Sequence, residues 1–219
     1  MEEKNKKKIA ERWCWFLFGL IINAFGIAFI TKGDLGTSQI SSIPYVLSLE
    51  FSAISFGGMT FLINMLFILL QALLLGREFQ PFQLLQIVAN VLFSGCIDVG
   101  MAALFWLHPM GFLQRILCVV VGCIILALGI CVEVAPDVVT VPGEGIVKVI
   151  AHVSNKEFGK VKGAFDVTLI ATASALSLIF FHTLRGVGVG TVVSACLVGP
   201  MTTAFKKLPF IRHIYALKS

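Results

Sequence analysis

The stretch WCWFLFGLIINAFGIAFIT, residues 13–31, contains no charged side chain. A helix rises about 1.5 Å per residue and the hydrocarbon core of a bilayer is about 30 Å thick, so about 20 apolar residues span it. The charged residues 1–12 before it resemble the start of a signal peptide, but no small-residue cleavage site precedes Lys32. We therefore expect residues 13–31 to form an uncleaved first membrane-spanning helix.

Five further apolar runs are long enough to cross a bilayer: residues 51–76, 79–107, 116–132, 163–184 and 186–205. Asp98 interrupts the third span, and Asp166 and His182 interrupt the fifth. The third span is longer than a crossing requires, which predicts a tilt or a break near Gly95 or Gly100. The runs lack the alternation of barrel strands, so the predicted fold is an all-α membrane protein with about six transmembrane helices.

The composition agrees with a lipid environment. Hydrophobic residues make up 58% of the chain and charged residues 13%, whereas soluble domains carry roughly 45–50% and about 25%. The net charge of +5 comes from basic residues between the apolar runs. We interpret these as topology determinants and contacts to membrane lipids, and we expect no nucleic-acid partner. The six cysteines lie in apolar runs without metal-binding spacing, so neither a metal nor another cofactor is indicated.

The positions of Lys and Arg predict the orientation. If the N-terminus is cytoplasmic, 14 of the 17 basic residues fall in cytoplasmic segments, and only Lys32, Arg115 and Arg185 fall outside. Cytoplasmic loops of membrane proteins carry such an excess of positive charge. We therefore expect a multi-pass protein of the cell membrane with both termini cytoplasmic, namely a basic N-terminus of residues 1–12 and a basic tail of residues 206–219.

Two segments between spans are too polar to cross a bilayer and too long for tight turns. They comprise residues 32–50 and 133–159, and each contains a short apolar stretch, residues 40–49 and 146–153 respectively. Irregular backbone survives at membrane depth only where protein or water surrounds it. We expect each segment to form a re-entrant or broken helical element that lines a pathway.

The two halves of the chain resemble each other at a spacing of about 103 residues. Each half contains a span, an Asp, a semi-polar stretch, Phe-Gly and two more spans. The aligned pairs are Gly19 with Gly122, Gly26 with Gly129, Asp34 with Asp137, Thr37 with Thr140, Ile43 with Ile146, Phe56-Gly57 with Phe158-Gly159, Asn64 with Asp166, Gly95 with Gly199, and Asp98 with Thr202.

Three spans are an odd number, so the second half must cross the membrane in the opposite sense to the first. The sequence therefore predicts a 3+3 inverted-topology repeat, with halves at residues 13–107 and 112–205. Repeats of this kind place the binding site at their interface near the bilayer midplane, where discontinuous helices form it.

Carboxyl groups in or near the apolar runs are the first candidates for a site. An ionisable group in the hydrocarbon costs roughly 2.5–3.5 kcal/mol on insertion scales, yet Asp98, Asp166 and Glu144 occupy such positions. In the functional interpretation they bind a substrate, a proton, Na⁺ or an amine. In the alternative interpretation they are hydrogen-bonding partners between helices, and Asp166 simply meets Lys160 or Lys162.

The predicted substrate- or ion-binding site has six further members: Asn64, Asp34, Asp137, Thr37, Gly143 and Gly145. Glycines permit sharp turns and a close approach of the backbone. A helix that begins after Gly145 would present its first N–H groups to an anion. Glu144 beside it disfavours a bare anion and leaves a zwitterion open.

Several motifs resemble the YczE/YitT-type bacterial multi-pass membrane proteins, over about residues 19–205. They are Gly33-Asp34-Leu35-Gly36-Thr37, Gly95-Cys96-Ile97-Asp98, Pro142-Gly143-Glu144-Gly145, Phe165-Asp166, Gly186-Val187-Gly188-Val189-Gly190-Thr191 and Gly199-Pro200. The resemblance implies a transporter. The chain departs from the family at Thr37-Ser38-Gln39, where many members have Pro-Trp-Asp. Because of this departure, the resemblance does not assign a ligand role to Asp34, the acid of the first half.

These features favour a secondary transporter of a small metabolite or cation, coupled to protons or sodium, with its site at the repeat interface. One alternative is a channel or passive facilitator, either as a monomer or as a homodimer. A non-transporting binding subunit or scaffold is another. The sequence contains no nucleophile–base set, P-loop or dinucleotide fingerprint, so we do not expect an enzyme.

Overall fold

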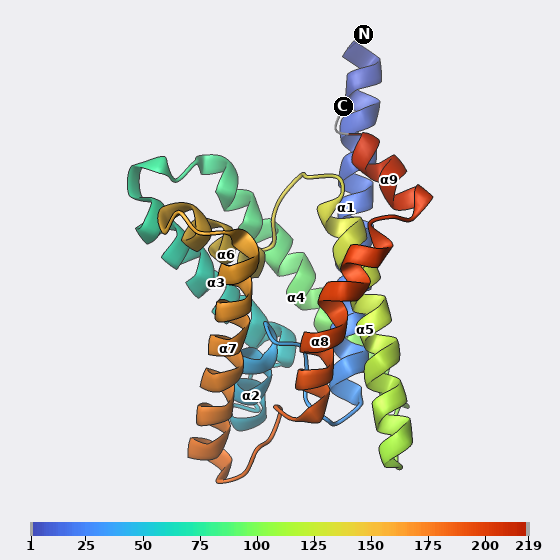
Figure 1. Cartoon of the computed structure of the whole chain (residues 1–219), viewed down its shortest axis with the longest axis vertical. Helices are drawn as coiled ribbons and strands as arrows, with labels where there is room; N and C mark the ends of the chain where they lie inside the picture. Colours follow the sequence, from blue (N-terminus) through green and yellow to red (C-terminus); the bar gives the residue numbers. More distant parts are fainter. Residues whose placement is uncertain (1, 218–219) are drawn as a thin grey trace.

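The computed structural model describes residues 2–217, with side chains over residues 8–217. The described chain is entirely helical (Figure 1). Its α-helices are α1 (Glu2–Lys32), α2 (Ser42–Glu50), α3 (Phe56–Leu75), α4 (Leu85–Ala103), α5 (Phe112–Val134), α6 (Pro142–Val153), α7 (Phe158–Phe181), α8 (Val189–Phe205) and α9 (Pro209–Ala216). Two 3₁₀ turns, η1 (Gly76–Glu78) and η2 (Pro81–Leu84), join α3 to α4.

Five stretches are long and apolar enough to cross a membrane: Lys8–Lys32, Phe56–Glu78, Pro81–Ala103, Phe112–Val134 and Phe158–Phe181. A sixth arises if α8 and α9, bent by 72°, count as one broken span. The protein is therefore a multi-pass membrane protein, and the predicted all-α class with about six spans is confirmed. Both the start of α1 and α9 lie at the same end of the molecule (Figure 1).

The sequence predicts a tilt or a break near Gly95 or Gly100 in the long third span, and the break is absent. Helix α4 is unbroken through Gly95 and Gly100 and begins only at Leu85. Within residues 79–107, the part ahead of α4 contains η2, and η1 comes just before it, where Gly76 adopts a positive φ of 52° that favours glycine. In α8, Pro200 lies inside an otherwise continuous helix.

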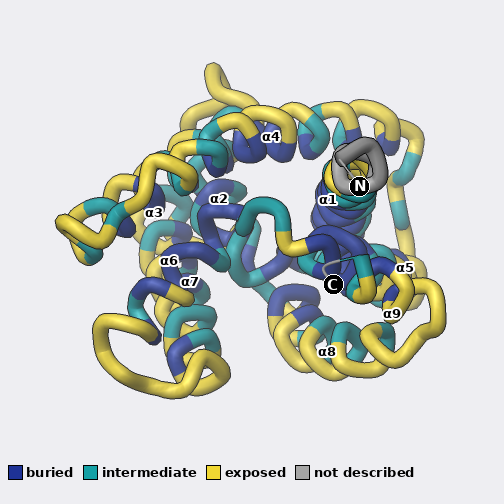
Figure 2. The backbone as a smooth tube through the Cα atoms, turned by 90° about the horizontal axis from the view of Figure 1, so that it is seen from above, coloured by how far each residue is buried: buried dark blue, intermediate teal, exposed yellow. Residues whose placement is uncertain are grey.

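The two semi-polar segments form the short helices α2 and α6, of 9 and 12 residues. Both are too short to span a bilayer. The backbone turns towards each of them at an aspartate in the left-handed region, Asp34 with φ 53° and Asp137 with φ 52°. Helices α2 and α6 each pack against both α3 and α7, and Figure 2 shows α2 in the middle of the helix array.

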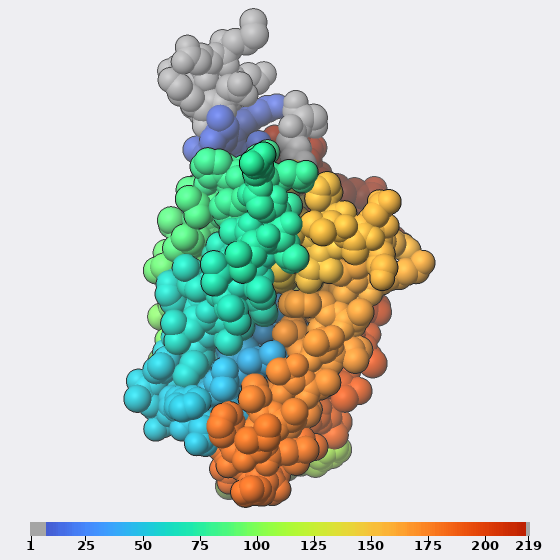
Figure 3. Space-filling view, turned by 90° about the vertical axis from the view of Figure 1, so that its left-hand side faces the viewer, coloured from blue at the N-terminus to red at the C-terminus, as the bar shows by residue number. Residues whose placement is uncertain are grey.

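The helices form two groups. In the first, α1 packs on α4 and α5, and α5 packs on α8; in the second, α2 and α6 lie with α3 and α7. The pair α3–α4 joins the groups. Exposed residues face outwards in Figure 2, and Figure 3 shows α3 and α7 side by side on one face. Outward positions on α3 include Leu62, Leu66, Leu69 and Leu73, as lipid contact requires.

The most extensive helix contact is the antiparallel crossing of α1 and α5. Gly19 and Gly26 on α1 face the backbone of Glu133 and Leu126, while Gly129 on α5 faces Asn23. A Cβ added at Gly26 would lie 2.5 Å from the Leu126 nitrogen. Small residues let two backbones approach in a membrane, where packing rather than water exclusion drives helix association.

Gly26→Leu is expected to destabilise the fold, because neither backbone can move away without opening the α1–α5 interface. Overpacking of this kind costs about 1–3 kcal/mol or more. The matched control is Gly95→Leu, since a Cβ at Gly95 on α4 meets open space. Thermal unfolding in detergent, followed by tryptophan fluorescence, should show a lower Tm for Gly26→Leu alone. Equal Tm values for both variants would contradict the packing argument.

Candidate functional site

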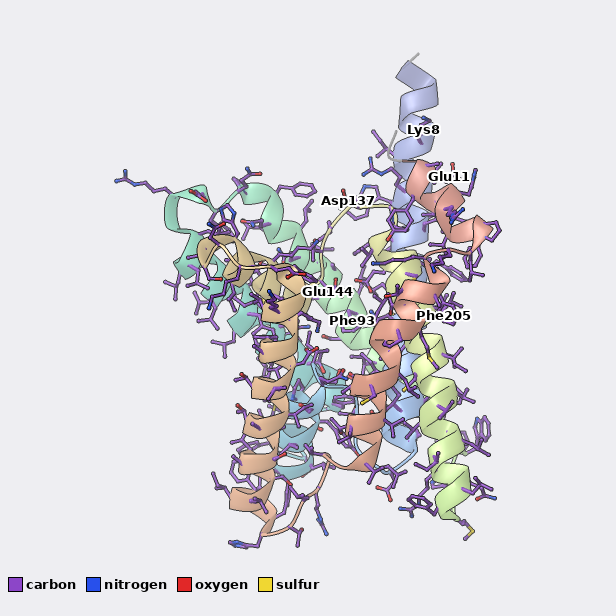
Figure 4. All side chains as sticks on the ribbon, in the orientation of Figure 1. Lys8, Glu11, Phe93, Asp137, Glu144 and Phe205 are labelled. Carbon is purple, nitrogen blue, oxygen red and sulfur yellow. The ribbon has the colours of Figure 1, made fainter. Side chains whose placement is uncertain are left out.

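A cavity of about 400 Å³ separates the two helix groups. Helices α1, α3, α4, α5, α6, α7 and α8 and the loop before α2 contribute to its walls. Figure 4 labels two of the lining residues, Glu144 and Phe93, near the middle of the molecule. A volume of this size is within the range of pockets that bind small molecules.

The beginnings of α2 and α6 meet at this cavity. Ser38, Gln39 and Ser41 line it just ahead of α2, and Gly143 and Glu144 line it in the first turn of α6. A side chain at Gly143 would collide with the Ile40 side chain, so the absence of a Cβ lets the two helix starts approach. The N-termini of both short helices, with their partial positive charge, thus border the same space.

Five charged side chains line the cavity, and they differ in their partners. Lys162 and Asp166 form an ion pair at 2.7 Å, and Lys148 donates to the Thr140 hydroxyl at 3.0 Å. Among the described side chains, none makes a hydrogen bond or ion pair with the Glu144 carboxylate. Glu144 is therefore the acidic group of the cavity that remains open to a ligand; Lys206 is the fifth charge.

A buried carboxyl lies directly behind the cavity wall. Glu133, only 2% exposed, accepts a hydrogen bond of 2.6 Å from the Asn23 side-chain amide, and Asn23 lines the cavity. An unpaired carboxylate at this position would carry a large desolvation cost, so Asn23 is a required partner. A change at Asn23 therefore reaches both the cavity surface and the α1–α5 interface.

The predicted site residues are only partly brought together. The cavity holds Glu144, Asp166, Asn64 and Gly143. Asn64 donates from its side-chain amide to the Asn90 side chain at 2.8 Å, which ties α3 to α4. Asp166 pairs with Lys162, which is the contact that the alternative interpretation of Asp166 as a structural residue predicts.

Gly145 and Asp137 border a different cavity, of about 340 Å³. Gly145 packs against the paired side chains of Gln71 and Gln86, whose amides exchange hydrogen bonds of 3.2 and 3.1 Å. The Asp137 carbonyl accepts a hydrogen bond of 3.0 Å from Arg12. These two predicted residues are separate from the central cavity.

Asp34 and Thr37 lie near the start of α8, away from the end of the molecule where α1 begins (Figure 1). The Asp34 carboxylate pairs with Arg115 at 2.9 Å, beside a third cavity of about 500 Å³. Thr37 is fully buried, and its hydroxyl lies 2.8 Å from that of Thr31. Its N–H donates to the Thr191 hydroxyl at 3.3 Å. Both residues therefore hold the loop before α2 in place rather than facing the central cavity.

Asp98 has a local partner set at the start of α3. Its carboxylate accepts hydrogen bonds from the Ser55 hydroxyl at 2.6 Å and from the Gly57 N–H at 2.8 Å. The first N–H groups of a helix lack intrahelical partners and carry partial positive charge. Asp98 thus caps α3 from the neighbouring helix α4, and it is not among the residues that line the central cavity.

Sequence reasoning missed several lining residues. Lys148 and Lys206 counted only as determinants of topology, and Lys162 in addition only as a partner of Asp166, although all three border the cavity. Asn23 passed without notice, yet it is the one amide side chain in the run of residues 13–31. A polar residue in the middle of an apolar span was the available signal, since such groups face protein or water rather than lipid.

The fold and the cavity define a multi-pass helical membrane protein with a cavity between its helices that charged side chains border. Residues 10–207 match a family of unknown function, DUF6198, and the chain belongs to that family. No curated protein and no solved structure matches the chain.

Asp98→Ala should lower the Tm by removing the cap of α3. Loss of a cap costs about 1 kcal/mol. Asp98→Asn retains an oxygen acceptor for Gly57 and is expected to lose less. Thermal unfolding of the two variants beside the unmodified chain measures the difference. An unchanged Tm for Asp98→Ala would mean that the cap contributes nothing to stability.

Proposed function

We propose that the protein is a secondary transporter of a small metabolite or cation that binds in the central cavity, coupled to protons or sodium. The observation that carries this proposal is the cavity of about 400 Å³ between the helix groups, into which two short helices begin. Transporter sites of this type lie at a repeat interface and use discontinuous helices. Glu144, with neither a hydrogen bond nor an ion pair among the described side chains, is the proposed ligand for a cationic or amine group.

The α1–α5 crossing supports an inverted repeat. At the spacing of 103 residues, Gly26 corresponds to Gly129 and Leu126 corresponds to Asn23. The repeat therefore relates the contact between Gly26 and Leu126 to the contact between Gly129 and Asn23. Both contacts are present. Counterpart helices that cross in antiparallel fashion, with reciprocal contacts, are what a pseudo-two-fold axis in the membrane plane requires.

The short helices support the same axis. Ile40 and Gly143 are counterparts at the same spacing, and they touch each other. Residues that contact their own counterparts lie on the axis itself. Helix α2 packs on α3 and α7, and α6 packs on α7 and α3, so their neighbours are also exchanged. The proposed site therefore lies where the axis passes between the halves.

Contacts at the far end of the cavity favour a carrier over a permanently open channel. The Gly190 N–H donates to the Leu35 carbonyl at 2.7 Å, and the Thr37 N–H bonds the Thr191 hydroxyl. These bonds fasten the loop before α2 to the start of α8. A cavity blocked at one end suits alternating access.

The proposal includes the orientation with both termini cytoplasmic, a place in the cell membrane, and membership of the YczE/YitT-like group. Lys206 and Lys207 precede the amphipathic helix α9 and Arg212 lies within it, while its Ile211 and Ile214 are buried, and this arrangement suits contact with anionic lipid. It includes no enzymatic activity.

Reconstituted protein is expected to show gradient-dependent uptake that Glu144→Gln abolishes, because the substitution removes the one open carboxylate of the cavity. Solid-supported membrane electrophysiology with amino acids, monocarboxylates and amines as probes, under proton or sodium gradients, measures it. Glu78→Gln is the control, since Glu78 is exposed and pairs with His152 outside the cavity. Uncoupled conductance would indicate a channel instead, and an unchanged response in Glu144→Gln would displace the site.

A further inference from the structure

The two proposed halves differ in the packing of one helix pair. Helix α3 packs along α4, whereas the counterpart pair, α7 and α8, lies on two walls of the central cavity. Figure 1 shows the corresponding separation of the two ribbons. The first half thus provides an internal example of how the second half packs when it is closed.

Two counterpart positions at the helix starts record the difference. Gly57 at the start of α3 faces the Ser94 carbonyl and Asp98 on α4, but a Cβ at Gly159 on α7 would meet open space. Phe56 is 7% exposed and belongs to the core, while its counterpart Phe158 is 43% exposed. The first turn of α7 therefore has the packing surface of α3 without a partner.

The counterpart surface on α8 borders the central cavity. In the alignment of the halves, Ser94 corresponds to Val198 and Asp98 to Thr202, and both Val198 and Thr202 line the cavity. Phe158 lines the same cavity from the other side. The two surfaces that would meet thus face one common space.

We propose that the first turns of α7 close onto α8 at Val198 and Thr202 in a second state of the protein, with Gly159 as the point of closest approach. Closure shuts the cavity at the end where α1 begins and buries Phe158 as Phe56 is buried now. This inference rests on the proposed transport function, for which it supplies the second of the two states that alternating access needs.

Polar groups are available to hold the closed state. The N–H of Gly159 lies in the first turn of α7, where backbone donors have no intrahelical acceptor. The Thr202 hydroxyl, which now donates to the Val198 carbonyl at 2.6 Å, takes the place that the Asp98 carboxylate has opposite Gly57. It becomes the acceptor for that N–H when the helices meet.

The test is a distance measurement between the ends of α7 and α8 in lipid nanodiscs. Spin labels on unnatural amino acids at Lys160 and Lys207, both exposed, leave the six native cysteines in place. Double electron–electron resonance of the full chain is expected to show a long and a short distance. Gly159→Leu should remove the short one, because the larger side chain prevents contact with α8.

Gly163→Leu is the matched control. Gly163 also faces open space on α7, but its counterpart in the first half is Phe61, so a large side chain is compatible with the closed packing there. The control should keep both distances. Phe158→Ala should reduce the short-distance population, since it removes the apolar surface that closure buries. A single distance that none of the variants alters would overturn the proposal, as would a short distance that persists in Gly159→Leu.

The same preparations separate this inference from the transport function. Two distances in a chain that shows no flux under any gradient would leave closure standing and remove the transport proposal. Gradient-driven flux in a chain with one fixed distance would leave transport standing and remove the closure of α7 onto α8.

Discussion

The close antiparallel crossing of α1 and α5 is the constraint on which the remaining structure depends. Glycines at residues 19 and 26 and their counterparts on α5 bring the two backbones into contact. That contact sets the positions of α4 and α8, which pack on opposite partners of the pair. The second helix group then remains at a distance from the crossing, and the cavity occupies the intervening space.

Polar groups at membrane depth are informative because each requires a partner. Most have one: Asn64 bonds Asn90, Gln71 bonds Gln86, and Asp98 caps α3. These pairs fix neighbouring helices relative to each other. The exceptions gather at the central cavity, where Glu144 has no such bond among the described side chains. The paired groups fix the helices relative to one another, and the carboxylate without such a bond borders the cavity.

The sequence predicted the spans well because apolar length is a local property. It also located the short helices, since residues 32–50 and 133–159 differ in composition from their neighbours. It could not separate Asp98 from Glu144, because both are acids near apolar runs and only the fold shows which one meets a helix N-terminus. The lysines were equally ambiguous, because a lysine that orients the chain in the membrane and a lysine that borders a cavity look the same in the sequence.

Pro200 in α8 has a mechanical consequence. Proline has no N–H, so the Cys196 carbonyl loses its helical hydrogen bond and the helix is softened at that level. Beyond this joint lie Thr202, Thr203 and Lys206, and farther on α9 is anchored by Ile211 and Ile214 against Cys131 and Ala135. One wall of the cavity is thus a short segment between a backbone that lacks one helical hydrogen bond and an anchored helix, and the bond from Cys131 Sγ to the Thr202 carbonyl ties this segment to α5.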